Sequence, residues 1–362
     1  MQGDTGLINR IICGLFVGIL LLPGEAQSAV AAEKTELEGF MRAGGSVSNS
    51  ETKYMEQIDR AGNSDDTHFG LAFARQINQR WSANGMIFGS ATENDYAVAV
   101  ENAFITFRAY EEASFNLGKM PYPNLIVSAY YDEGVDYPWV RPPEEVYRVK
   151  VLGPALSYKT FSGLKYNYVK TIKDFEFLFG LYGGDATVDK DKMSKMSGAV
   201  ISVGDHSFKV RAAYNQSTLV LGTGTERETA LDNKRQYVKS AGVNFDARYV
   251  IGMAEYVEGG VADVNEVSTR AYYYTFGVRL GKLLAHYTAA EFKADNKLGQ
   301  QSVAYGLTYV ASHAASVKLE YKKIQPTERV DSDPLHNPAG HFAEVPVEKD
   351  VSIYTLAIDV KF

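Results

Sequence analysis

Apolar and polar side chains alternate with a period of two along most of this chain. The alternation is clearest near the C-terminal end, where large apolar residues share one parity and small or charged residues share the other: Tyr354, Leu356, Ile358, Val360 and Phe362 against Thr355, Ala357, Asp359 and Lys361. A period of two is that of a β-strand, because successive side chains point to opposite faces. The pattern therefore predicts an all-β fold whose strands are apolar on one face and polar on the other.

Segments of this kind recur, and the predicted fold is a transmembrane antiparallel β-barrel of about 16 strands. They span 36–47, 67–77, 81–91, 98–110, 113–120, 162–172, 174–183, 194–204, 206–216, 236–246, 248–257, 269–280, 283–292, 301–311, 314–324 and 351–362. Short turns and longer loops alternate strictly between them. Turns on one side and loops on the other, with an even strand number, are typical of bacterial outer-membrane barrels. Segments 81–91 and 162–172 alternate poorly, so 14 to 18 strands fit the pattern.

The alternation alone fits two kinds of fold. In a soluble sandwich of two sheets, each strand also has one face in a core and one face in water. In a membrane, however, an open sheet edge would leave backbone N–H and C=O groups unpaired, at a cost of several kcal/mol each. A membrane location therefore requires that the sheet close into a barrel.

A secretory signal peptide is predicted at the N-terminal end. Arg10 precedes an apolar run, residues 11–22, and small residues lead up to Ala31. Such a run is too short to cross a bilayer as a helix, which needs about 20 residues. Cleavage is expected after Ala31, or alternatively after Ser28, which leaves residues 32–362 as the barrel domain.

Charge and cysteine content exclude several classes of protein. Without residues 1–31 the chain carries 36 basic and 42 acidic side chains, a net charge of −6, which is not the balance of a nucleic-acid-binding protein. Cys13, the only cysteine, leaves with the predicted signal peptide. The mature protein is therefore expected to have no disulfide and no thiolate metal site.

The longest link, residues 121–161, is expected to carry the function. Between residues 122 and 147 it contains five acidic side chains and one basic side chain. A loop of this length in a compact fold is usually functional or disordered, and its prolines and aromatic residues argue against disorder. We call it loop 121–161.

Several motifs, in their order along the chain, resemble Gram-negative porins. They are Ala103-Phe104-Ile105-Thr106-Phe107, then Ser114-Phe115-Asn116-Leu117-Gly118-Lys119, the acidic third long loop with Tyr137-Pro138-Trp139-Val140-Arg141-Pro142-Pro143-Glu144-Glu145-Val146-Tyr147, and the final strand that closes on Phe362. The resemblance spans nearly the whole predicted mature chain. It implies an outer-membrane channel, commonly a homotrimer, whose partners are membrane lipids and the small hydrophilic solutes and ions that diffuse through it.

In porins the third loop folds into the lumen and narrows it, with acidic loop residues facing basic residues of the wall. The resemblance assigns Asp132, Glu133 and Asp136 to the acidic side. It assigns Arg42, His68 and Lys119 to the basic wall. His68 stands where many porins have an arginine. Strand parity places Lys119 on the lipid side, so this assignment requires a bulge at Gly118.

The sequence leaves other readings of its chemistry open. A weak cation preference is expected from the acidic excess, and a substrate-specific channel for a sugar or an anion is the alternative. The aromatic residues of loop 121–161 could form a sugar path, although anchoring of the loop is the simpler reading.

His336 and His341 could bind a divalent metal, but a solvated loop is favoured, so no metal or cofactor is expected. The histidines lack a matching serine motif, so no catalytic activity is expected.

Overall fold

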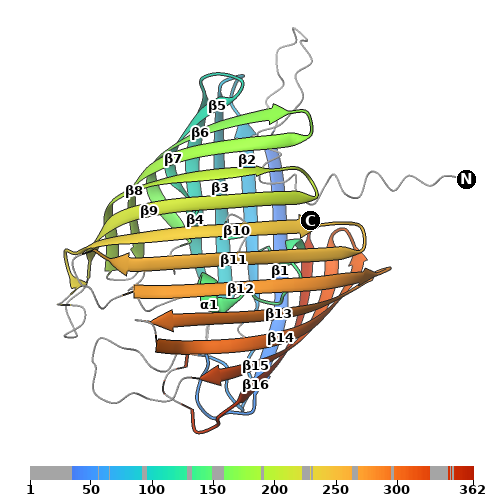
Figure 1. Ribbon diagram of the computed structural model, residues 1–362. Coiled ribbons are helices and arrows are strands. Elements are labelled where there is room, and N and C mark those ends of the chain that lie inside the picture. Colours follow the sequence, from blue (N-terminus) through green and yellow to red (C-terminus); the bar gives the residue numbers. More distant parts are fainter. Residues whose placement is uncertain are drawn as a thin grey trace, which may run out of the picture.

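The computed structural model describes residues 35–55, 57–64, 66–91, 96–128, 133–148, 159–188, 191–221, 229, 231–262, 268–294, 297–326, 341–342, 344 and 346–362. Its strands form one closed antiparallel barrel, in which each strand pairs with its neighbours in sequence and β1 pairs with β16 (Figure 1). The predicted signal peptide, residues 1–31, lies outside the described residues, as does Asp132.

The barrel has sixteen strands, as the alternation predicted. Their bounds are β1 Thr35–Ser48, β2 His68–Gln76, β3 Trp81–Ala91, β4 Tyr96–Arg108, β5 Ala113–Pro121, β6 Thr160–Ile172, β7 Phe175–Val188, β8 Asp191–Gly204, β9 Phe208–Val220, β10 Arg235–Asp246, β11 Val250–Val261, β12 Ser268–Leu280, β13 Leu283–Ala294, β14 Lys297–Ser312, β15 Ala315–Pro326 and β16 Val351–Lys361. Loop 121–161 contains a short 3-10 helix, η3 (Gly134–Asp136), and one turn of helix, α1 (Glu144–Tyr147). Within the described residues, no helix is long and apolar enough to cross a membrane.

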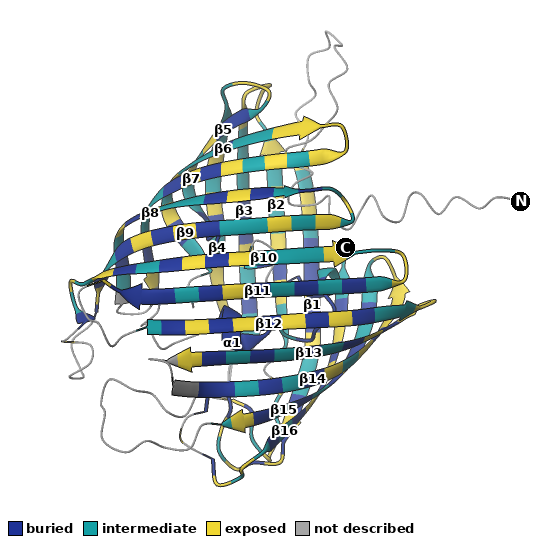
Figure 2. Cartoon of the chain, in the orientation of Figure 1, coloured by how far each residue is buried: buried dark blue, intermediate teal, exposed yellow. Residues whose placement is uncertain are grey.

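Exposure alternates along the strands and separates the two faces of the wall. On β12, Tyr272, Tyr274 and Phe276 are exposed, whereas Tyr273 and Thr275 are buried (Figure 2). Large apolar side chains thus cover the outer face, and the alternating positions point into the lumen. This outward apolar surface is the feature that a barrel in hydrocarbon requires.

Several of the observed strands, β7 among them, reach further toward the long loops than the alternation predicted. β7 was expected to end at residue 183 but runs to Val188. Gly184 has a φ of +158° and its register with β8 shifts just after it, so the parity of the side chains changes while the pairing continues. Because a bulge breaks the alternation of side chains, a prediction based on a period of two ends the strand too early.

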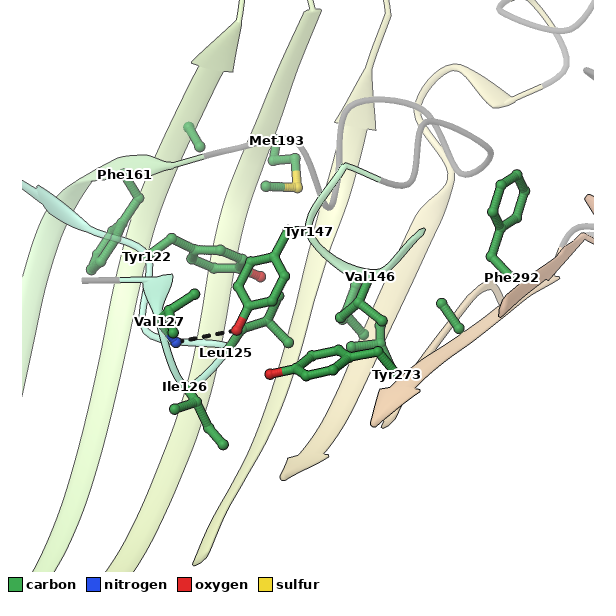
Figure 3. Packing of buried hydrophobic residues seen from close by; sticks show 14 of the residues in the cluster. Tyr122, Leu125, Ile126, Val127, Val146, Tyr147, Phe161, Met193, Tyr273 and Phe292 are labelled. Atoms are coloured by element: carbon green, nitrogen blue, oxygen red, sulfur yellow. Dashed lines mark hydrogen bonds between the residues drawn. The ribbon is translucent and has the colours of Figure 1, made fainter. Parts of the chain in front are cut away.

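The largest buried apolar cluster lies where loop 121–161 packs on lumen-facing side chains. Tyr122, Leu125, Val146 and Tyr147 of the loop meet wall residues of strands between β5 and β13, among them Tyr273 of β12 (Figure 3). In Figure 1, α1 is seen behind β12, and it contacts β11, β12 and β13. The loop therefore packs against the inner wall through a hydrophobic interface.

Candidate functional site

Lys318 of β15 is the central tether of loop 121–161. Its ammonium donates to the backbone carbonyls of Gly134, Tyr137 (2.6 Å) and Trp139 (2.8 Å). The same ammonium pairs with Asp359 of β16 at 3.3 Å. An ammonium has three donors, which suits it to collect several carbonyls of an irregular segment. One wall lysine thus fixes both ends of η3.

Arg42 and Asp359 form a second buried link beside this tether. They lie directly opposite each other in the β1–β16 ladder, and their atoms Nε and Oδ1 are 2.6 Å apart. Arg42 also donates to the carbonyl of Val140. A Cβ at Gly134 would collide with the Arg42 and Asp359 side chains, so any larger residue there would force this buried pair to shift.

Both described acidic residues at the start of this segment pair with one lysine. Lys361 of β16 lies 2.8 Å from a carboxylate oxygen of Glu133 and 3.2 Å from one of Asp136. Burial raises the pKa of Glu133 to about 7, although Lys361 opposes the shift. The two carboxylates therefore face the wall at β16 and serve as loop anchors.

The helix α1 carries a further ion-pair cluster. The carboxylates of Glu144 and Glu145 both pair with Lys322 of β15. Gln300 of β14 donates to Glu145 at 2.6 Å and Tyr54 lies against the same lysine. Burial alone would raise the pKa of Glu145, but Lys322, His341 and the hydrogen bond from Gln300 act together to hold the pKa below its ordinary value.

Two aromatic side chains of the loop complete the attachment through their polar ends. Trp139 donates its Nε1–H to the hydroxyls of Thr275 and Thr288, each at 2.9 Å. Tyr147 donates to Glu255 of β11, whose carboxylate also accepts from Tyr273 at 2.9 Å. Buried tryptophan and tyrosine side chains need such partners. Of the two readings of the loop aromatics, these contacts favour anchoring.

Two cavities flank the loop inside the barrel. The loop-side cavity is lined by Arg42, Asp66, His68, Phe88, Tyr137, Arg141, Arg148 and Lys159, among others. The turn-side cavity lies toward the short turns, and its charged lining residues are Glu36, Glu38, Arg80, Arg108, Lys165, Glu176 and Arg211. Their wall residues come from β1 to β7 and β9, and neither cavity is lined by the strands from β11 to β16 that hold the loop.

Asp66 holds Arg141 at the edge of the loop-side cavity. The Nε atom of Arg141 lies 2.7 Å from a carboxylate oxygen of Asp66, and the guanidinium also contacts Ser46. Burial alone would raise the pKa of Asp66, but Arg141, with Arg42 and Ser46, holds the pKa below its ordinary value. The carboxylate is therefore ionised under ordinary conditions.

The basic residues assigned from the sequence do not face Glu133 and Asp136 across a gap. Arg42 is buried beside the loop and lines the loop-side cavity. His68 lines the same cavity and contacts the ring of Phe88 at a centroid distance of 5.5 Å.

Lys119 lies on the outer parity of β5. The β4–β5 register runs without a shift, so no bulge at Gly118 turns it inward, and its ammonium donates to the Val100 carbonyl. Asp132 is outside the described residues. The expected facing pairs are thus not assembled in the described part of the chain.

The anchoring residues Lys318, Lys322, Lys361 and Glu255 were not singled out from the sequence. Strand parity was the available signal, since it places charged residues of β15 and β16 on the lumen face. Parity does not reveal the partner, because partners follow from how the loop docks. For the metal alternative, His336 lies outside the described residues, and those described contain no cluster of His, Cys, Asp and Glu placed to hold a metal ion.

No protein-family model matches the chain, and no curated protein matches its sequence. Solved structures do match it over nearly its whole length. OmpF of Salmonella typhi, in complex with daunomycin, has a TM-score of 0.60 at 15% identity, covering 91% of this chain and 98% of that one. The outer-membrane channel DcaP of Acinetobacter baumannii has a TM-score of 0.58 at 14% identity, covering 94% and 100%. An anion-selective porin from Comamonas acidovorans has a TM-score of 0.61 at 10% identity, covering 91% and 100%.

Proposed function

We propose that this chain, a sixteen-stranded barrel with the porin fold, is an outer-membrane channel through which small hydrophilic solutes and ions diffuse passively. The observation that carries the proposal is the pair of lumen cavities beside loop 121–161. Because the described middle of the loop is tied to the wall at β1 and β11–β16, the remaining passage lies between the loop and the opposite wall. Transport, and not catalysis, is the activity that such an arrangement supports.

The charges along this passage support an anion preference over the weak cation preference expected from the sequence. The four described carboxylates at residues 133, 136, 144 and 145 are each paired with a wall lysine. Among the described residues, the two cavities are lined by eight basic and four acidic side chains. Asp359 pairs with Arg42 but does not line either cavity. If it is added to the acidic groups, the basic groups still exceed the acidic groups by three. Charges that line a narrow pore select ions of opposite sign.

The outer surface supports the remaining parts of the proposal. Its apolar side chains would contact membrane lipids, and a homotrimer is the assembly that the resemblance to porins implies. Residues 1–31 would direct the chain across the inner membrane and be removed.

Single-channel recording of the purified protein in a planar bilayer tests the proposal. Stepwise, ohmic currents are expected, together with a reversal potential in a potassium chloride gradient that has the sign of chloride preference. Absence of current steps from heat-modifiable, folded protein would refute the channel. A potassium-selective reversal potential would leave the channel standing and refute the anion preference.

A further inference from the structure

Lys165 differs from the lysines that anchor the loop. It lies on the lumen face of β6, is half-buried and lines the turn-side cavity. Within the described part of the chain its ammonium has no hydrogen-bond or ion-pair partner, whereas Lys318, Lys322 and Lys361 are each paired with carboxylates. A charge removed from bulk water without a partner is costly, which makes it a strong point of attachment for an anion.

The surroundings of Lys165 are positive and polar. Arg211 of β9 is the charged group that acts on it electrostatically, and its guanidinium donates to the Pro123 carbonyl at the start of the loop. Asn116 lies directly opposite Lys165 in the β5–β6 ladder. Asn102 lines the same cavity, is 3% exposed, and has an amide Nδ2 without a partner.

The carboxylates of the region are distant or already engaged. Glu176 is six positions from the residue that pairs with Lys165 on β7, about 20 Å along the strand. Glu255 interacts electrostatically with Arg211. Its carboxylate already accepts hydrogen bonds from Tyr147, Tyr273 and the backbone N–H of Ile126. Glu36 and Glu38 reach the cavity from β1, which is five strands away from β6 around the barrel.

Part of the cavity lining is apolar. It includes Phe104, Met120, Leu125, Ile126 and Leu178. A strongly hydrated inorganic anion gains nothing from such a wall. A ligand with an apolar body gains by removing that surface from water, while its charged end reaches the ammonium.

We propose that the turn-side cavity is a binding site for a small organic carboxylate with an apolar body. Lys165 pairs with the carboxylate, and Arg211 adds positive potential. The apolar body rests on Met120 of β5 and on Leu125 and Ile126 of the loop. The inference rests on the proposed function, because it names the class of solute that the channel retains on its way through.

Benzoate is the probe, and benzamide is its uncharged counterpart. In single-channel recordings, millimolar benzoate added on the turn side should interrupt the current and benzamide should not. Lys165→Gln should weaken half-maximal block about ten- to a hundredfold, the effect of losing one charge-assisted hydrogen bond. Lys165→Arg should restore most of it.

Lys209→Gln is the matched control, since Lys209 lies two residues before Arg211 on the same lumen face and does not line the cavity. It removes the same charge from the lumen and should leave benzoate block unchanged. Equal block by benzoate and benzamide, or equal loss in the two glutamine variants, would overturn the site while the current steps still uphold the channel. If folded protein passes no current, the proposed function itself fails.

Discussion

The ammonium of Lys318 and the carboxylate of Asp359 lie 3.3 Å apart, and each side chain is 1% exposed. Asp359 also pairs with Arg42 across the β1–β16 seam that closes the barrel, and Lys318 donates to carbonyls of loop 121–161, so this buried pair links the seam to the loop.

Lys318→Met should release the middle of the loop without opening the barrel. The variant leaves a buried carboxylate with one partner fewer, and breaking such a pair costs about 3–5 kcal/mol. We expect noisier open-channel current and a lower temperature for the loss of heat-modifiable migration. Lys323→Met is the control, because Lys323 on the outer parity pairs with Asp350 in an exposed position; equal effects in both variants would contradict the tether.

Trp139→Phe should destabilise the loop mildly, by about 1 kcal/mol. The indole N–H to Thr275 and Thr288 is lost, but these two hydroxyls are 2.7 Å apart and can satisfy each other. Trp139→Ala should cost more, about 3–5 kcal/mol, because it leaves a cavity. The thermal midpoints of the two variants measure the difference, and a smaller loss for alanine than for phenylalanine would show that the side chain is not packed.

Protonation of Glu133 should make the lumen more positive. Its pKa is raised to about 7, so lowering the pH through 7 neutralises Glu133 and leaves Lys361 with Asp136 alone. Anion preference, measured from the reversal potential, should therefore rise between pH 8 and pH 6. Because the folded state holds this proton more tightly than the unfolded chain, the associated stability is complete below the ordinary carboxyl pKa and is lost as pH rises through about 7. Glu133→Gln should abolish both transitions, and their persistence would assign them to another group.

Asp66→Asn should increase anion preference at every working pH. Asp66 is the one carboxylate among the described residues that line the loop-side cavity, and its pKa lies below the ordinary value. Its removal leaves Arg141 uncompensated. The double variant Asp66→Asn, Arg141→Gln should return the reversal potential toward that of the parent. A reversal potential that is unchanged in the single variant would place this pair off the ion path.

Strand positions followed from the sequence because the membrane imposes a strict period of two. The same rule put Lys318 and Lys361 on the lumen face and Lys119 on the outer face, where the structure has them. The rule failed where a bulge changes the side-chain parity. At Gly184 of β7 the alternation breaks, so the residues of the strand that follow were not predicted.

The chemistry of the lumen was less predictable for a physical reason. Glu133 and Asp136 were expected to face a basic wall across a gap, but pairing depends on which wall strand the loop docks against. That docking is fixed by apolar packing around Tyr273 and by hydrogen bonds to backbone carbonyls, neither of which has a sequence period.

Cysteine accessibility tests most directly where the passage lies. Cys13 is the only cysteine of the chain and lies in the predicted signal peptide, so a single cysteine placed in the barrel is the only thiol expected in the mature protein. Asn116→Cys puts a thiol in the turn-side cavity, whereas Ala290→Cys puts one in the buried cluster behind the loop. A negatively charged methanethiosulfonate reagent should reduce the current through the first variant and leave the second unchanged. Rapid modification of the second with no effect on the first would place the passage on the other side of the loop and contradict the account.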